Sequence, residues 1–360
     1  MTTLAERSRS RDNNFDVLRL AAAVLVLVAH SWALTGRAGP TFPGAGLVVM
    51  GVPIFFAISG FLIARSWHLD PRAGAFVVKR VLRLWPALLV VLVFSAFVLG
   101  AAVTDRTLGD YFSSPKVTQY LIDNARLHTT FILPGVFDHN PGSDGVNGSL
   151  WTLPAEVKAY AIVLALGVAG LLRRPLMVLA VLTFVIWMLV GDGSTRPYSL
   201  AHALGSPDEI QFIAYFVGAA LLFSLRERVP LDWRLGLAAA AALWLTNKSG
   251  VELKTAAWVV ALPYLIVFLA YSTPAWLRVA VRPGDLSYGI YIWAFPVQQT
   301  IMWADGSLSP VALLALAAPI TYALAYGSWH LVEAPALRLK RRLPVRGAAR
   351  STPAVDAQAA

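Results

Sequence analysis

Apolar stretches long enough to cross a membrane recur along almost the whole chain. A helix needs about 20 predominantly apolar residues to cross the hydrocarbon core of a bilayer. The composition agrees, because 57% of the 360 residues are hydrophobic and 14% are charged, whereas soluble domains have about 25% charged residues. We therefore predict an all-α, polytopic integral membrane protein with about ten transmembrane helices. The predicted spans are residues 15–35, 44–66, 83–103, 152–172, 175–191, 209–226, 233–247, 254–272, 285–304 and 309–332.

The lysines and arginines predict how these spans are oriented. With the N-terminus inside, most basic residues fall in cytoplasmic segments, including those at residues 7–11, 79–83, 226–234 and 338–350. The positive-inside rule then places both termini in the cytoplasm of a multi-pass protein of the plasma (inner) membrane. The net charge of +10 is mainly a signal of topology. Nucleic-acid binding is not expected, because the basic residues are scattered over separate loops.

The pattern indicates one membrane domain, residues 14–334, between two tails. Residues 1–13 are polar and basic, and residues 335–360 end in small and polar side chains. Neither tail can bury a core, so we expect both to be largely disordered. The chain has no cysteine, which excludes disulfides, thiolate metal sites and a cysteine nucleophile. We predict no metal site.

Two ionisable residues, Arg19 and His30, lie in the first predicted span. Their spacing places both side chains on one helix face, about 16 Å apart along the axis. Between them, Ala22, Ala23 and Val26 are small enough to leave room for a ligand. An ionisable group in a membrane helix is unfavourable by about 2.5–3.5 kcal/mol at the bilayer centre and indicates function by default. We interpret this face as one wall of a path through the membrane.

Three further basic residues, Lys79, Arg80 and Arg83, lie within about one helical turn at the cytoplasmic side. Anchoring of the chain by the positive-inside rule explains such residues in most membrane proteins. The alternative is a cationic mouth for a phosphorylated ligand, since arginine binds phosphate through two hydrogen bonds. With Arg19 on a neighbouring helix, the two explanations carry equal weight.

Small and aromatic residues in two spans have a structural explanation that we favour over a functional one. In GVPIFFAISGFLI, Ser59 and Gly60 are of the type that packs closely between membrane helices. Tyr288, near the start of a later span, is typical of the aromatic belt at a membrane interface.

Glu156 and Tyr160 form an i, i+4 pair at the start of the predicted helix in NGSLWTLPAEVKAY. The helix dipole alone favours a carboxylate in the first turn. His30 is expected at a similar depth in the outer leaflet. The histidine and the glutamate can therefore act as a base and its orienter, or as a base and an acceptor ligand.

Taken in order, these segments resemble the acyltransferase-3 family of polytopic membrane acyltransferases. The resemblance covers about residues 13–342 and rests on Arg19 with His30, GVPIFFAISGFLI, KRVLRLWPALL, NGSLWTLPAEVKAY, LSYGIYIWAFPV and WHLVEAP. The family transfers acetyl or other short acyl groups from acyl-CoA to hydroxyls of carbohydrates on surface polysaccharides, O-antigens or glycolipids. The resemblance implies that His30 is the catalytic residue, that Arg19 takes part in donor binding, and that Glu156 is the family's glutamate.

The resemblance also implies a reaction. We expect cytosolic acyl-CoA, in the first instance acetyl-CoA, as co-substrate, with no permanently bound cofactor and with its phosphates near Lys79, Arg80 and Arg83. His30 then deprotonates the acceptor hydroxyl, or forms a covalent acyl-histidine, and Glu156 assists it. Further residues expected to bind substrate are Ser59, Trp151, Tyr160 and Tyr288.

The chain departs from the family pattern at two positions. Pro53 replaces an acidic residue and Ala294 replaces a histidine that many members carry, so we expect the chemistry to depend on His30 and Glu156. Some relatives have a fused extracellular domain; without one, the chain is expected to act alone or with a separate extracytoplasmic acyl-accepting protein. Two other functions stay open: an exporter or flippase of a lipid-linked sugar, and a scaffold subunit.

Overall fold

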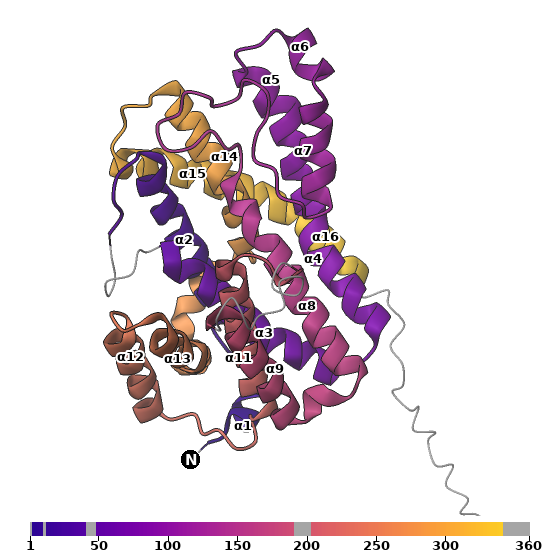
Figure 1. The fold of residues 1–360 in the computed structure, drawn as a ribbon, viewed down its shortest axis with the longest axis vertical. Helices are drawn as coiled ribbons and strands as arrows, with labels where there is room; N and C mark the ends of the chain where they lie inside the picture. The colour runs from indigo at the N-terminus through magenta and orange to yellow at the C-terminus, as the bar shows by residue number, and fades with distance from the viewer. Residues whose placement is uncertain (1, 10–11, 41–47, 191–202, 341–360) are drawn as a thin grey trace, which may run out of the picture.

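The structure is a computed structural model that describes residues 2–9, 12–40, 48–190 and 203–340 (Figure 1). Every regular element in these ranges is helical, apart from one isolated β-bridge between Thr3 and Pro230. The predicted all-α fold is therefore confirmed. The helices run mostly along the long axis of the molecule, and α5 (Gly100–Val103), α6 (Leu108–Ser113) and α7 (Pro115–Ala125) gather at one end.

Six helical segments in the described ranges are long and apolar enough to cross a membrane. They are α2 (Phe15–Leu34), Met50–Leu69 in α3 (Val48–Leu69), Ala73–Val103 beginning with α4 (Ala73–Phe94), Gly148–Val168 containing α8 (Leu153–Val168), Glu252–Ser272 in α13 (Val251–Ser272), and Pro310–Leu339 comprising α15 (Pro310–Ser328), a π-helical turn (Trp329–Glu333) and α16 (Ala334–Leu339). The chain is thus a multi-pass helical protein.

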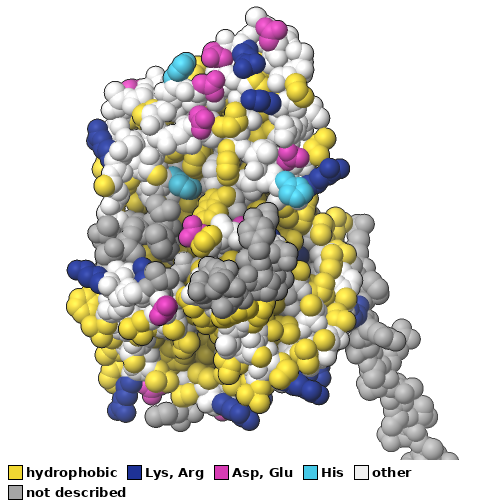
Figure 2. Space-filling model, viewed as in Figure 1, with side chains coloured by type: hydrophobic (Ala, Val, Ile, Leu, Met, Phe, Trp, Pro, Cys, Tyr) yellow, Lys and Arg dark blue, Asp and Glu magenta, His cyan; other side chains and the backbone are white. Residues whose placement is uncertain are grey.

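The other four predicted spans also coincide with helices, which are shorter or less apolar. They are α9 (Pro175–Val190), α11 (Pro207–Ser224), α12 (Trp233–Thr246) and α14 (Ser287–Ala304). A crossing number of about ten and the cytoplasmic placement of both termini stay predictions. Figure 2 shows hydrophobic side chains over much of one face, with Lys and Arg side chains along the edge near the N-terminus.

Two helices begin at positions where the sequence did not predict a helix. Helix α4 begins at Ala73 and not at residue 83, so Lys79, Arg80 and Arg83 belong to a helix. Within the N-terminal tail, Leu4–Arg9 form helix α1, where disorder was predicted. The reason is tertiary docking: Leu4 is fully buried, and its backbone N–H donates to the Val229 carbonyl at 3.0 Å. No local hydrophobic pattern signals that contact.

The C-terminal tail was also predicted to be largely disordered, from residue 335 onward. The structure continues α16 to Leu339, with Leu337 on the wall of an internal cavity. Residues 341–360, the rest of that tail, lie outside the described part.

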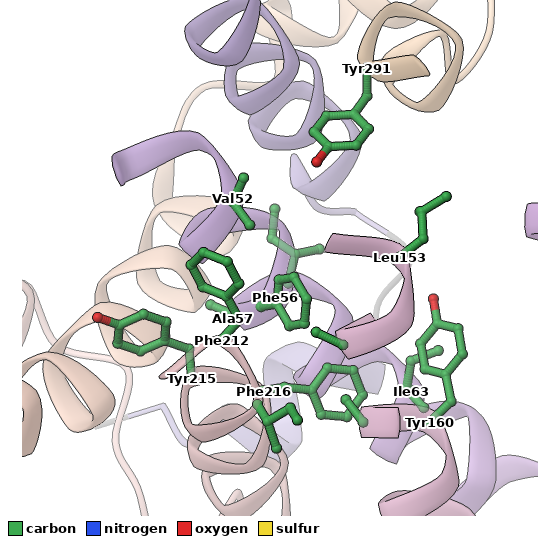
Figure 3. Close-up of a cluster of buried hydrophobic side chains, with 14 of the residues drawn as sticks. Val52, Phe56, Ala57, Ile63, Leu153, Tyr160, Phe212, Tyr215, Phe216 and Tyr291 are labelled. Atoms are coloured by element: carbon green, nitrogen blue, oxygen red, sulfur yellow. The ribbon is translucent and has the colours of Figure 1, made fainter. Parts of the chain in front are cut away.

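Helices α3 and α11 approach each other at a glycine. A Cβ atom on Gly60 would collide with the backbone carbonyl of Phe216. Figure 3 shows the surrounding cluster, in which Val52 and Phe56 of α3 lie beside Phe212 and Phe216 of α11. The packing interpretation of Gly60 is therefore confirmed: the glycine lets two membrane helices come into backbone contact.

This contact predicts a cost for the smallest possible side chain. Because the Phe216 carbonyl is part of a helix backbone, Gly60→Ala should lower stability by about 1–3 kcal/mol, as for other overpacked cores. The matched control is Gly327→Ala in α15, where a Cβ meets nothing within 4 Å; it should stabilise by about 0.5–1 kcal/mol. Thermal unfolding in detergent measures both, and equal melting temperatures would contradict the prediction.

Candidate functional site

A cavity of about 800 Å³ lies among α2, α3, α4, α8 and the start of α14. Its volume falls in the range of small-molecule sites, about 300–1,000 Å³. It brings together most of the residues that the sequence suggested: Arg19, Ser59, Lys79, Arg80, Arg83, Glu156, Tyr160 and Tyr288. Asp285, Thr152 and Tyr291 also line it, and they were not predicted.

Two of the arginines in this cavity are held by carboxylates. Arg83 Nη2 lies 2.7 Å from Asp285 Oδ2, and its Nη1 lies 3.4 Å from Glu333 Oε2. Arg19 Nη1 lies 3.6 Å from the same Asp285 oxygen and 3.4 Å from Asp16 Oδ1. Asp285 and Glu333 were missed by the sequence reading. Asp285 is the first residue of the predicted span 285–304, so the rule that ionisable residues in membrane helices indicate function would have selected it, whereas Glu333 lies just after the predicted span 309–332.

Lys79, a third predicted cation, is also paired. Its Nζ lies 2.6 Å from Asp70 Oδ2, and Arg72 Nε lies 2.6 Å from Asp70 Oδ1. The hydrogen bonds from Arg72 and Lys79 hold the pKa of Asp70 below its usual range. Asp70 therefore stays ionised at neutral pH and holds Lys79, which lines the cavity, in place.

Arg80 differs from these three residues. It has no carboxylate within 4 Å among the described residues, and its buried Nε has no hydrogen-bond partner there. Its guanidinium carbon lies 5.6 Å from the ring centre of Phe76 and 5.7 Å from that of Tyr160. Arg80 is thus a cation on the cavity wall that is held by aromatic rings, with its charge available to an anion.

Glu156 forms its hydrogen bond within its own helix. It accepts from the Tyr160 hydroxyl, and both side chains line the cavity. The expected pairing of Glu156 with His30 is not present: the buried Nδ1 of His30 has no hydrogen-bond partner in the described part of the chain. The glutamate thus faces the cavity, and among the described residues its hydrogen-bond partner is Tyr160 and not the histidine.

His30 lies just beyond the cavity. Its ring packs edge-on against Phe295, with 5.0 Å between ring centres, and Phe295 follows the cavity-lining Tyr291 by four residues on α14. One turn of α14, about 5.4 Å along its axis, therefore separates the cavity-lining Tyr291 from Phe295, the ring that contacts His30. At this end of the cavity, Tyr291 and Thr152 share a hydrogen bond of 2.6 Å between their hydroxyls.

The face of α2 between Arg19 and His30 is closed. Ala22 and Ala23 are fully buried, and a Cβ on Gly51 of α3 would meet the side chain of Val26. The expected path along these small residues is therefore wrong, because they serve close helix packing. The space beside Arg19 is instead the cavity, which residues of α3, α8 and α14 also line.

Three predicted substrate-binding residues have different surroundings. Ser59 lines the cavity. Trp151 does not line it, and its ring packs against Phe212 of α11 at 5.5 Å. Tyr288 is only 7% exposed, and its hydroxyl donates to the Leu84 carbonyl at 3.0 Å. It is therefore a buried wall residue and not the interface anchor that the sequence favoured.

Comparison with known proteins agrees with the resemblance seen in the sequence. The acyltransferase-3 family model, described as "Acyltransferase domain", matches residues 12–330. The chain is 29% identical to the "O-acetyl transferase" of Shigella phage Sf6, over 90% of this chain and 95% of that protein. It is 28% identical to "Nodulation protein 10" of Rhizobium leguminosarum bv. viciae, over 95% and 97% of the two chains.

No solved structure gives a significant match. The family assignment therefore rests on the sequence, and it covers the helices that build the cavity as well as His30. The chain belongs to the acyltransferase-3 family and is an acyltransferase enzyme.

Proposed function

We propose that this protein moves an acetyl or other short acyl group from cytosolic acyl-CoA to a hydroxyl of a carbohydrate, in the plasma (inner) membrane. The observation that carries the donor assignment is the cation on the cavity wall, Arg80, which has no carboxylate within 4 Å and no hydrogen-bond partner for its Nε in the described part of the chain. Coenzyme A is rich in phosphate, and arginine is the side chain best suited to bind it. The name of the phage relative, O-acetyl transferase, supports an oxygen acceptor and an acetyl group.

The four basic residues expected to bind the donor differ in how close their carboxylate partners lie. Arg83 and Lys79 are neutralised by carboxylates at 2.7 Å and 2.6 Å, so we assign them mainly to holding the cavity in shape. We assign a direct phosphate contact to Arg80. Arg19, whose carboxylates lie at 3.4 Å and 3.6 Å, is less closely paired than Arg83 and Lys79, and we assign it a second contact with the phosphorylated part of the donor.

We propose that the acyl end of the donor reaches His30 past Tyr291 and Thr152. His30 takes the proton of the acceptor hydroxyl, and the oxygen attacks the thioester carbonyl. The C–S bond breaks, the O-acyl ester forms, and CoA leaves as the thiol after gaining a proton. A covalent acyl-histidine is the alternative route. Ser59, Glu156 and Tyr160 line the cavity and are proposed to orient the donor.

The carbohydrate acceptor is proposed from the family, and no permanently bound cofactor or metal is invoked. A separate extracytoplasmic acyl-accepting protein is a further possible partner, besides the lipid bilayer. The family assignment makes the alternatives of an exporter without acyl transfer and of a scaffold unnecessary.

His30 is the residue on which the proposed chemistry depends. In purified protein supplied with labelled acetyl-CoA, His30→Gln and His30→Ala should lower acyl transfer by about 10²–10⁴-fold, the usual contribution of a general base. CoA binding should stay unchanged, because His30 does not line the cavity. The control is His139→Gln, a change at an exposed histidine in a turn. Full transfer by both His30 variants would remove this residue from the chemistry.

Arg80 and Arg83 should respond differently to the same substitution. Arg80→Gln should weaken CoA binding by at least tenfold with little change in melting temperature, since no ion pair is lost. Arg83→Gln should lower the melting temperature, because it leaves Glu333, which is 2% exposed, without its cation. Calorimetric titration with CoA measures the effect of each variant on binding, and thermal unfolding measures its effect on stability. A loss of stability in Arg80→Gln but not in Arg83→Gln would reverse our assignment.

A further inference from the structure

Asp285 lies where helices α2, α4 and α14 meet, directly before the first turn of α14. Its Oδ2 atom is 2.7 Å from Arg83 Nη2 and 3.6 Å from Arg19 Nη1. A single carboxylate oxygen therefore faces guanidinium groups from two other helices. Both guanidiniums belong to the wall of the cavity.

The carboxylate is itself fixed in place. Its Oδ1 accepts hydrogen bonds from the Ser287 hydroxyl at 2.5 Å and from the Ser287 backbone N–H at 3.4 Å. The side chain of Asp285 is 15% exposed. Anchored to the start of α14, it cannot follow one arginine away from the other, so it sets where both guanidiniums lie.

The other carboxylates near these arginines cannot replace it. Asp16, the second partner of Arg19, is 58% exposed, and ion pairs in that setting contribute little. Glu333 is 2% exposed and contacts Arg83 at 3.4 Å. Without Asp285, Arg83 would keep a buried carboxylate within 4 Å, whereas Arg19 would keep only the exposed Asp16 within that distance among the described residues and would be repelled by Arg83.

We propose that Asp285 is a positioning residue for the acyl donor: it holds Arg19 and Arg83 side by side so that Arg19 meets the phosphorylated part of acyl-CoA. This inference rests on the proposed donor function of the cavity. Asp285 does not itself touch the donor, since a carboxylate repels phosphate. It acts through Arg19.

The chain contains a matched control for this residue. Asp305, at the other end of α14, makes the same local contacts: its Oδ1 accepts from the Ser307 hydroxyl at 2.6 Å and from the Ser307 N–H at 3.0 Å. It pairs with no arginine or lysine among the described residues. Asp305→Asn therefore reproduces the change in the turn without the change at the arginines.

The experiment is titration of full-length protein in nanodiscs with CoA, together with the KM and kcat for acetyl-CoA. Asp285→Asn should raise the Kd and the KM about tenfold and leave kcat within about twofold; Asp305→Asn should match the wild type. Asp285→Asn combined with Arg19→Gln should bind CoA no more weakly than Arg19→Gln alone. If the double variant instead binds CoA more weakly than Arg19→Gln alone, by the factor that Asp285→Asn causes on its own, Asp285 does not act through Arg19. That result would overturn the proposal.

A second variant tests whether the position of the Asp285 carboxylate matters or only its charge. Asp285→Glu keeps the charge but moves the carboxylate by one methylene, so it should fold and still raise the Kd for CoA. Wild-type affinity in Asp285→Glu would mean that this carboxylate only balances charge, and wild-type or tighter binding by Asp285→Asn would mean that it has no part in donor binding. Either outcome would overturn the proposal. If the wild type itself binds neither CoA nor acetyl-CoA, the proposed donor function fails and the inference fails with it.

Discussion

Charged groups inside a membrane protein have to be paired or to face a polar cavity, because lipid offers them no partner. The central cavity is built around that constraint. Arg19 from α2, Arg83 from α4 and Asp285 before α14 meet at its wall, and Glu333 from the π-helical turn after α15 contacts Arg83. These four charges connect segments from both ends of the chain, and they leave the cavity polar where the surrounding helices are apolar.

The helices around this network are brought together by small residues. Gly60 places α3 in backbone contact with α11, and Gly51 places it against Ala22 and Val26 of α2. Because lipid tails are as apolar as leucine, such contacts depend on close packing rather than on the hydrophobic effect. Close packing at these positions leaves the open space of the site between α3, α8 and α14, where Tyr291 and Thr152 separate it from His30.

The neighbours of each cation divide the basic residues into two groups. Lys79 and Arg83 already have carboxylates close by, so part of their charge is used within the protein. Arg80 is held by the rings of Phe76 and Tyr160 and has no carboxylate within 4 Å among the described residues. Two arginines three positions apart on one helix thus have different surroundings, and this difference is the basis of the separate roles that we propose for them.

The sequence by itself determined the helical class, the positions of the apolar stretches, the family and a set of candidate site residues, most of which line the cavity. Each of these follows from local composition or from short motifs, which can be read without knowing how the helices pack. It did not reveal Asp285 and Glu333 as partners of the arginines, because ion pairs between residues 83, 285 and 333 depend on which helices become neighbours.

The sequence also misjudged the small face of α2. Ala22, Ala23 and Val26 have the same size whether they line a path or pack against a helix, and only the position of α3 decides between the two. The separation of Glu156 from His30 has the same origin. Depth along two helices can be read from a sequence, but the rotation of each helix about its axis is set by its neighbours, and that rotation decided which side chains share the cavity.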